Sequence, residues 1–284
     1  MTVRFGPAGQ DEIFPTIHKS TLDMPAYLAA KGLSAFEYQC GHGVRVGEAT
    51  AAALGAKAKE YGIAISLHAP YYISLSSEDE QKRLNSLNYV LESARAVNWM
   101  GGERVVIHSG SVSKGNRRDA LALAVDTLTR AQKMLDEEKL SHVRLCPETM
   151  GKHGQLGDLE EVLALCGVDE RFIPCIDFGH LNARSGGGVN SYPQMAAILD
   201  TMENTLGKAR AQAFHAHFSK IEYTSKGEAR HLTFADRKYG PDFEPLARLI
   251  FERGLTPTII CESRGTQIAD AVTMLDVYNR SVQP

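Results

Sequence analysis

The chain has 284 residues, of which 43% are hydrophobic and 23% are charged, and its formal net charge is −3. Barrels of alternating strands and helices occupy this length as one domain, so we expect residues 1–284 to form a single domain. Acidic and basic residues are spread along the chain, which argues against a polybasic tail or run of the kind that binds nucleic acid or a membrane surface.

Short apolar runs alternate with longer segments of helical period along the chain. The runs, each expected to be a strand, are Val3–Phe5, Ala35–Tyr38, Ile63–Leu67, Arg104–Ile107, Val143–Cys146, Ile173–Ile176, Ala211–Phe214 and Thr258–Cys261. Between them, Glu80–Trp99 and Arg117–Leu135 repeat apolar residues at three- and four-residue spacing, which is typical of amphipathic helices.

This alternation predicts the fold class. Strand-then-helix repetition gives parallel strands with right-handed crossovers, and eight such strands close into an α/β fold of the (β/α)₈ TIM barrel type. An open doubly wound sheet is the alternative. The glycine-rich phosphate-binding motifs that would favour a nucleotide-binding sheet are absent from the sequence.

Residues that commonly bind metal ions stand at the ends of consecutive strands of this pattern. They are His68, His108, Glu148, Asp177 with His180 three residues later, His215 and Glu262. The carboxyl ends of barrel strands open on one face, where the active sites of such barrels lie, so we expect these side chains to converge on one cavity. A single histidine at a strand end is as often an ordinary hydrogen-bonded residue; the joint pattern is what favours a metal cluster.

The mixture of imidazole and carboxylate indicates which ions the cluster would take. It suits Zn²⁺, Mn²⁺ or Fe²⁺, and a carboxylate such as Glu148 can bridge two of them through its two oxygens. Ions held close together can ionise a water, bind substrate oxygens and stabilise a leaving oxygen. We therefore expect metal-assisted chemistry in which Glu148, Asp177 and Glu262 take part in catalysis.

At these residues the chain resembles the endonuclease IV family of apurinic/apyrimidinic (abasic-site) endonucleases, within the xylose-isomerase-like barrel superfamily. The resemblance runs from about residue 63 to residue 262 with the order and spacing of the motifs kept. The matching segments are His68-Ala69-Pro70-Tyr71, Val106-Ile107-His108-Ser109-Gly110, Glu148-Thr149, Asp177-Phe178-Gly179-His180 and Glu262. In Phe214–Lys220, His215 aligns with the family's ligand on strand seven. His217 replaces what is usually an asparagine, and we expect it to orient a ligand.

The resemblance implies a trinuclear zinc site. In such a site His68, His108 and Glu148 hold one ion, and a second is held by Glu148, Asp177, His215 and Glu262. His180 and His231 hold the third, but Ala229 stands where the family has an aspartate. Glu228, one residue earlier, is either a substitute ligand or a solvated loop acid. At least two ions are expected to co-purify with the protein.

A second departure from the family concerns DNA. Family members carry an Asn-Pro-Arg-type loop after strand two that probes the duplex, whereas this chain has Tyr38–Arg45 there. His42 and Arg45 are candidates for phosphate contacts, which need only donors and charge, or for binding a small anionic substrate. Tyr71 is a candidate for stacking on a sugar or base, although a tyrosine that caps the barrel is just as ordinary.

These features leave three functions open. The first is hydrolysis of a phosphodiester at an abasic site in DNA, and His108, His180 and His231 favour it because a one-metal isomerase does not need them. The second is a metal-dependent sugar isomerase or epimerase of the same superfamily, in which Glu148 or Glu262 moves a proton. The third is a metal-storing or DNA-scaffolding barrel without catalysis.

Cysteine usage and hydropathy bear on the compartment. The five cysteines, Cys40, Cys146, Cys166, Cys175 and Cys261, show no Cys-x-x-Cys spacing, which argues against a disulfide framework and a thiolate zinc site. No signal-peptide pattern and no run of about 18 apolar residues occurs. We expect a monomeric cytoplasmic protein that contacts no membrane.

Overall fold

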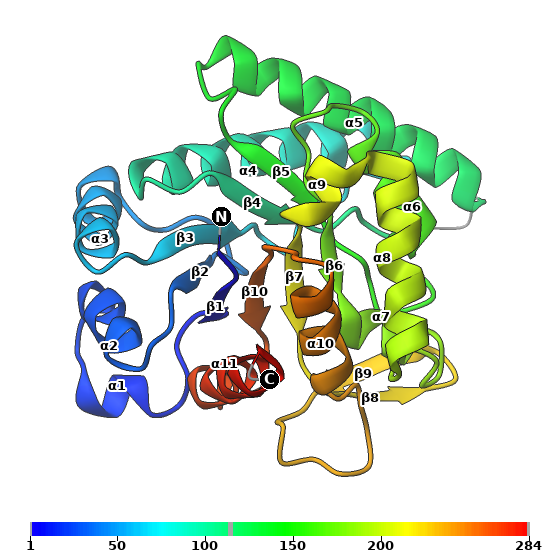
Figure 1. The fold of residues 1–284 in the computed structure, drawn as a ribbon. Coiled ribbons are helices and arrows are strands. Elements are labelled where there is room, and N and C mark those ends of the chain that lie inside the picture. Colours follow the sequence, from blue (N-terminus) through cyan, green and yellow to red (C-terminus); the bar gives the residue numbers. More distant parts are fainter. Residues whose placement is uncertain (1, 113–115, 283–284) are drawn as a thin grey trace.

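Parallel strands form the centre of the molecule and helices surround them (Figure 1). The computed structural model describes residues 2–112 and 116–282. The central strands are β1 (Arg4–Pro7), β2 (Ala35–Gln39), β3 (Ala64–His68), β4 (Arg104–Ile107), β5 (Arg144–Pro147), β6 (Cys175–Asp177), β7 (His215–Phe218) and β10 (Thr258–Cys261).

The central strands close into a barrel. Hydrogen bonding orders them as β2-β3-β4-β5 and β1-β10-β7-β6, and all neighbouring pairs are parallel. Isolated parallel bridges between Ala8 and Glu37 and between Glu148 and Cys175 join the two sets of strands. The predicted (β/α)₈ barrel is confirmed.

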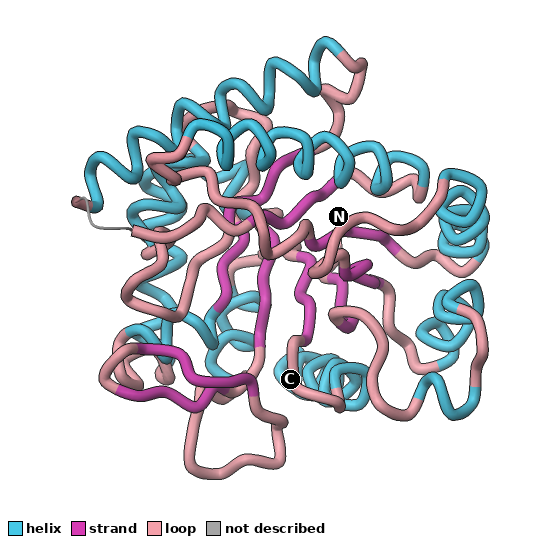
Figure 2. The backbone as a smooth tube through the Cα atoms, turned by 180° about the vertical axis from the view of Figure 1, so that it is seen from behind, coloured by secondary structure: helices cyan, strands magenta, loops and turns pink. Residues whose placement is uncertain are grey.

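Helices cover the outside of the barrel, as the view from behind also shows (Figure 2). They are α1 (Phe14–Ile17), α2 (Met24–Ala30), α3 (Glu48–Glu60), α4 (Glu80–Trp99), α5 (Arg117–Glu137), α6 (Leu159–Cys166), α7 (Phe178–Arg184), α8 (Tyr192–Leu206), α9 (Lys208–Gln212), α10 (Glu244–Glu252) and α11 (Gln267–Val282), with a short 3₁₀ turn at Thr21–Asp23. Both helices expected from periodicity are present. The side chain of Asp79 caps the first turn of α4 and that of Asn116 caps α5, which fixes where each begins.

Strand β7 differs from the sequence prediction. The expected strand Ala211–Phe214 lies instead across the end of α9 and the following turn, and the strand runs from His215 to Phe218. A hydrophobicity pattern counts imidazoles as polar and therefore places them after a strand. Inside a barrel, however, the end of a strand carries the polar side chains of the site. His215 therefore begins β7 and does not end it.

An antiparallel hairpin, β8 (Ile221–Thr224) and β9 (Gly227–His231), follows β7 directly and was not expected from the sequence. It lies at the edge of the molecule beside α7 in both ribbon views. The amide of Glu228 donates to the carbonyl oxygen of Gly151 at 3.1 Å, so the hairpin is fastened to the loop after β5. This contact brings the last residues of the hairpin toward the mouth of the barrel.

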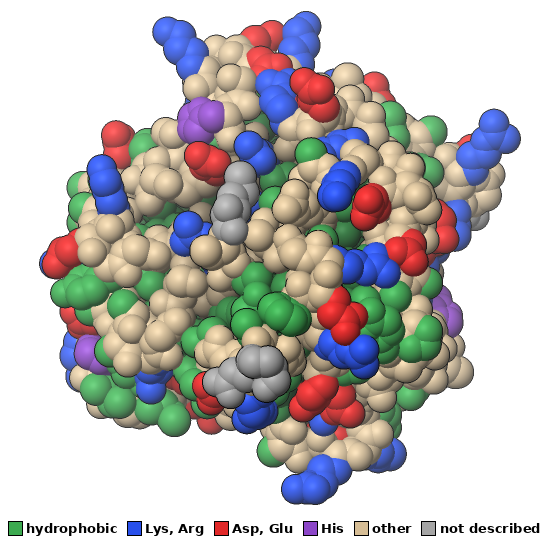
Figure 3. All heavy atoms as spheres, viewed as in Figure 1, with side chains coloured by type: hydrophobic (Ala, Val, Ile, Leu, Met, Phe, Trp, Pro, Cys, Tyr) green, Lys and Arg blue, Asp and Glu red, His purple; other side chains and the backbone are tan. Residues whose placement is uncertain are grey.

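The surface seen in Figure 3 carries Lys, Arg, Asp and Glu side chains interspersed, and neither sign gathers in one patch. This distribution agrees with the small formal charge of the chain. Within the described ranges, no helix has both the length and the apolar character needed to cross a membrane. All five cysteines are buried and free.

Candidate metal centre

The carboxyl ends of the barrel strands open into a cavity of 990 Å³. Its lining includes most of the metal-type side chains expected from the sequence, namely His68, His108, Glu148, His180, Glu228, His231 and Glu262. These residues come from strands and loops that lie far apart in the sequence. The barrel topology is what brings them together.

The inward side chains of the strands form two successive layers. Residues two apart on a strand point to the same face, and strand register decides which of them share a level. At the upper level His68 is in register with Gln39, and Asp177 with His217. At the level below, in the barrel interior, Glu37 is in register with Ser66. The same deeper level pairs Cys175 with His215.

Three groups of side chains at the upper level could each hold a metal ion. The first group is His68, His108 and Glu148. Glu148 Oε2 lies 3.3 Å from His68 Nε2 and 3.1 Å from His108 Nε2. His68 Nδ1 lies 2.9 Å from the carbonyl oxygen of Ala69. A carbonyl only accepts, so the proton sits on Nδ1 and the Nε2 lone pair faces the group.

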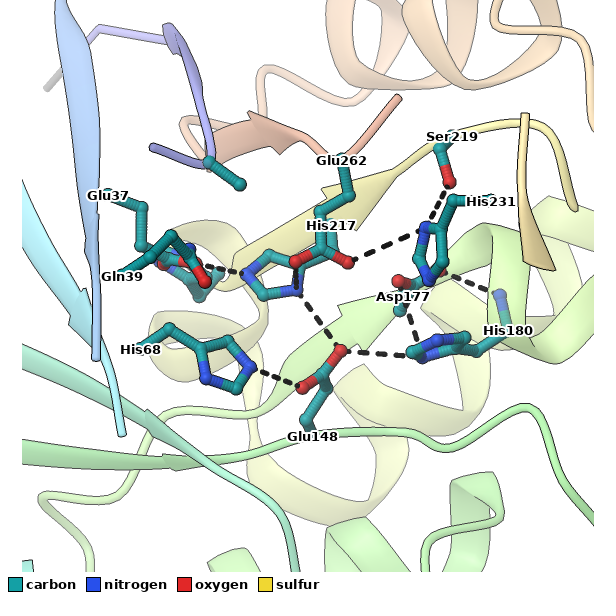
Figure 4. A network of polar contacts seen from close by, with 12 residues as sticks. Glu37, Gln39, His68, Glu148, Asp177, His180, His217, Ser219, His231 and Glu262 are labelled. Carbon is teal, nitrogen blue, oxygen red and sulfur yellow. Dashed lines mark hydrogen bonds and ion pairs between the residues drawn. The ribbon is translucent and has the colours of Figure 1, made fainter. Parts of the chain in front are cut away.

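The second group is Glu148, Asp177, His217 and Glu262, whose ligand atoms lie within 4.8 Å of one another. His217 Nδ1 is 3.1 Å from Glu148 Oε1 and 3.4 Å from Glu262 Oε1. Glu148 therefore belongs to both groups, one oxygen facing each, as Figure 4 shows. This is the geometry of a bridging carboxylate.

The third group is His180, Glu228 and His231. Glu228 Oε2 lies 3.4 Å from His180 Nε2, and its Oε1 lies 3.8 Å from His231 Nε2. The other ring nitrogens have partners elsewhere: His180 Nδ1 is 2.9 Å from the Thr149 carbonyl oxygen, and His231 Nδ1 is 2.9 Å from Ser219 Oγ. Glu228 was expected to be either a substitute ligand or a solvated loop acid. Its position between the two histidines favours the substitute ligand, because Ala229 has no side chain that could bind an ion.

The donor set fits divalent cations. Asp177 Oδ2 is buried and has no hydrogen-bond partner. Among the ion pairs of the described residues, the carboxylates of the three groups meet histidines and no lysine or arginine. Buried carboxylates are costly unless they are paired or coordinate a cation. Nitrogen and oxygen ligands in such a mixture suit Zn²⁺ and its neighbours in the first transition row.

Burial and neighbouring charges drive the pKa values in these groups apart. Burial raises the pKa of Asp177 to about 6; Glu262 adds to this shift and His180 opposes it. Burial acts on Glu148 in the same direction, but His217, His108 and His180 outweigh it and hold its pKa well below the usual range. His217 likewise overcomes the effect of burial on Glu262 and lowers its pKa to about 2. All three carboxyls are thus mainly charged at neutral pH, and Asp177 is the first of them to take up a proton as the pH falls.

The structure places His215 outside the second group, which it was expected to join; the group of possible ligands that contains it is Cys175, His215 and His217. His215 lies one level below the second group and is completely buried, with its Nε2 3.0 Å from Glu37 Oε2. His217, expected only to orient a ligand, takes its place beside Glu148 and Glu262. The reason is the two-residue period of the strand, which puts both imidazoles on the inner face at different depths.

Glu37 is a site residue that the sequence analysis missed. Its carboxylate is completely buried between His215 and His217, at 3.0 Å from each. Burial works against its charge, but His217 and His215 together hold its pKa well below the usual range. A signal was present: a glutamate inside an apolar strand run is rarely buried without a partner.

The candidates for substrate contact line the cavity at its rim. Tyr71 is 56% exposed, and its ring centroid lies 5.6 Å from that of His108. His42 and Arg45 lie on the loop after β2 and also line the cavity. None of the three belongs to a group that could hold an ion.

Residues 25–278 match the model of a family described as the xylose isomerase-like TIM barrel, which covers most of the chain. The chain belongs to this barrel family. A protein of Methanocaldococcus jannaschii with no described activity is 36% identical over 225 residues, which cover 78% of this chain and 80% of that protein. A probable endonuclease 4 of Acholeplasma laidlawii is 30% identical over 172 residues, 58% of this chain and 56% of that relative.

Solved structures share the fold of this chain. Endonuclease IV from Thermus thermophilus superposes with a TM-score of 0.69 at 21% identity over 98% of both chains. A D-tagatose 3-epimerase-like protein superposes with a TM-score of 0.68 at 19% identity over 88% of both. The resemblance to endonuclease IV expected from the motifs is confirmed. Both a nuclease and an epimerase-like protein have this fold, so the fold does not distinguish the two functions. Only the residues of the site can do so.

Proposed function

We propose that this barrel is a metal-dependent phosphodiester hydrolase that acts on abasic sites in DNA. The observation that carries the proposal is that three groups of ligands lie side by side and that Glu148 is shared by two of them. His108, His180 and His231 have no role in a one-ion site. Relatives named probable endonuclease 4 support the same activity.

The chain's own residues supply the binding and the proton transfer. His68 and His108 with Glu148 would hold one ion, the second group another and the third group a third. Bound Zn²⁺, or Mn²⁺ or Fe²⁺ in its place, would supply Lewis acidity toward the phosphodiester. Glu262 faces the cavity with 15% of its side chain exposed, so its carboxylate is placed to accept a proton from water there.

The cavity and its rim fit an extruded nucleotide. Extruding an abasic nucleotide from a duplex is cheap because no base has to be unstacked. Tyr71 offers an exposed ring at the entrance, next to His108. Arg45, Lys152 and Arg264 also line the cavity and have no ion-pair partner within the described part of the chain, so their charge is available to phosphates.

A metal-dependent sugar isomerase or epimerase is the second candidate, and two observations favour it. The second group alone supplies three carboxylates and an imidazole, which is sufficient for one ion that holds vicinal sugar oxygens. The net charge of −3 also provides few contacts for a duplex. Under this function His108, His231 and Glu228 would be dispensable.

The test is incision of a synthetic duplex with one abasic site by metal-replete protein at low salt. We expect cleavage that a chelator abolishes, with weak binding and a shallow dependence on salt because few basic contacts are available. The protein with His108→Ala is the control for a contaminating nuclease. Incision no greater than in this control, together with metal-dependent turnover of a ketose, would favour the epimerase.

A further inference from the structure

We propose that Glu37 is a positioning residue that acts from beneath the metal centre, holding His217 so that Nδ1 presents its lone pair to the second group. His215 shares this carboxylate and completes the arrangement. The inference rests on the proposed metal-dependent function but concerns residues one level below the ligands. It assigns a role to two buried side chains that the proposed chemistry does not use directly.

The geometry around Glu37 is the first support. Its Oε1 lies 3.0 Å from His217 Nε2, and its Oε2 lies 3.0 Å from His215 Nε2. Ser66 Oγ donates to Oε2 at 2.9 Å, and Gln39 Nε2 donates to Oε1 at 3.3 Å. His217 Nε2 is buried and makes no aligned hydrogen bond within the described residues; the charge of the nearby Glu37 carboxylate favours a proton on this nitrogen.

The second support is a comparison with the other histidines of the centre. His68 and His180 each direct Nδ1 to a backbone carbonyl oxygen, and His231 directs Nδ1 to the hydroxyl of Ser219. These hydrogen-bond partners are uncharged. Carboxylates of the ligand groups themselves lie farther away, at 3.3 Å and 3.4 Å from His180 Nδ1 and at 4.0 Å from His231 Nδ1. His217 meets a carboxylate instead and directs the opposite ring nitrogen, Nδ1, at the ligand group. A carboxylate behind a histidine fixes the ring and strengthens the other nitrogen as a metal ligand.

The third support is that Glu37 has no other counter-charge. It is completely buried, and its ion-pair partners among the described residues are the two histidines. A buried carboxylate without lysine or arginine is costly to retain for packing alone. His215 explains how it is retained, since its Nε2–H occupies the oxygen that faces away from the ligands. The carboxylate is therefore held in place for His217.

The test measures zinc affinity by competition with a chelator for Glu37→Gln and Glu37→Leu. Glu37→Gln keeps the shape and removes the charge, and Glu37→Leu removes the acceptors. We expect one ion to bind about 10- to 100-fold more weakly while the others keep their affinity, with the larger loss in Glu37→Leu. Ser66→Ala is the matched control, because it removes one hydrogen bond to the same carboxylate and keeps its charge. It should bind like the wild type.

Two further readouts separate positioning from a general loss of structure. In the double variant Glu37→Gln/His217→Ala, Glu37→Gln should add no loss beyond that of His217→Ala alone. Spectra of protein labelled with ¹⁵N at histidine should show His217 with its proton on Nε2 in the wild type and a changed proton distribution in Glu37→Leu. Should Glu37→Leu fail to fold, the affinity and the spectra of Glu37→Gln carry the test.

The results that would overturn the positioning role differ from those that would overturn the proposed function. Wild-type affinity in Glu37→Gln, equal weakening of every ion, or an additive loss in the double variant would overturn the positioning role while leaving the nuclease proposal intact. Absence of any bound ion in the wild type would overturn both. Selective weakening of one ion in a protein that does not incise abasic DNA would support the positioning role and reject the proposed substrate.

Discussion

Two histidines of β7, His215 and His217, show that the position along a barrel strand decides which side chain reaches the candidate metal ligands. They are two residues apart and both completely buried, yet only His217 reaches the carboxylates of the second group. Burial lowers the pKa of His215 to about 4 and the hydrogen bond that His215 donates to Glu37 opposes this shift, so His215 is neutral at physiological pH. A neutral imidazole at that depth suits a supporting role.

Replacing each histidine should therefore have different consequences. We expect His217→Ala to lose one ion per chain and to reduce hydrolysis by at least about 100-fold, since it removes a ligand. His215→Ala should keep the full number of ions. Native mass spectrometry of both variants, with thermal melting to compare folding, checks this. Equal ion counts in the two variants, or loss of the ion from His215→Ala alone, would reverse the assignment of the ligand.

The raised pKa of Asp177 predicts how metal binding depends on pH. A carboxyl with a raised pKa holds a proton in the folded apo-protein between its unfolded value, about 3.9, and about 6. This group lowers apo-protein stability as pH rises through that window, and a bound ion has to displace the proton. The contribution of Asp177 to zinc affinity should thus rise with pH up to about 6 and then level off. Calorimetric titrations in buffers of different ionisation enthalpy would detect the released proton.

At the scale of elements, the β8–β9 hairpin completes the third group. Its approach depends on Gly151, because a Cβ atom at that position would lie 2.6 Å from Glu228 Cβ and 3.0 Å from His180 Cδ2. Backbone contacts with the loop after β5 hold the hairpin at this distance. The third group therefore depends on an element from outside the barrel sheet.

Gly151→Ala should displace the hairpin and weaken the third ion while the first and second groups remain. We expect one ion to be lost on mild dialysis against chelator, with the other two retained. Gly154, where an added Cβ meets no atom within 4 Å, provides the matched control in Gly154→Ala. If Gly151→Ala kept three ions as tightly as the control, Glu228 would not be a ligand held by the hairpin.

Helices α5 and α6 are joined by a partly buried ion pair between Arg117 and Glu161. Glu161 on α6 is largely buried and accepts from Arg117 Nε at 2.6 Å and from the amides of Gly157 and Asp158. Burial works against the charge of Glu161, but Arg117 and the two amides lower its pKa. The contact closes the first turn of α6 and fixes it against the start of α5.

Glu161→Gln should cost about 2 kcal/mol of unfolding free energy at neutral pH, because a charged acceptor is lost. A carboxyl with a lowered folded pKa stabilises above its unfolded pKa, and this contribution disappears as the pH falls through the folded value. The difference between wild type and variant should thus shrink below about pH 4. Denaturant unfolding of the chelated proteins at several pH values measures it; a difference independent of pH would contradict this explanation.

The sequence predicted the barrel and most of the upper level of the centre, because periodicity places strand ends and the motif residues follow them. The prediction failed where it had to tell at which depth in the barrel a side chain lies. Strand β7 was placed four residues too early, since its two histidines interrupt the apolar pattern that marks a strand. Glu37 and the hairpin were missed for a related reason: register between strands and docking of a loop are long-range contacts that local pattern does not encode.

At the scale of the whole molecule, the metal centre should couple to stability. The candidate ligands come from β3 through β10 and from the hairpin, so bound ions would tie together elements that are far apart in the chain. A ligand that binds only the folded state at about 100 times its Kd adds about 2.7 kcal/mol. The apo-protein retains buried carboxylates without a cation. The barrel should therefore be more stable with metal than without.

The central claim is that this barrel assembles a three-ion centre, and the most direct test counts ions per folded chain by native mass spectrometry of protein never exposed to chelator. Three divalent ions are expected in the wild type, two in Glu228→Ala and at most two in Glu148→Gln, which loses charge at the bridging position. One ion in the wild type would contradict the account and identify the second group as a site of the epimerase kind. No ion at all would reject the metal centre itself.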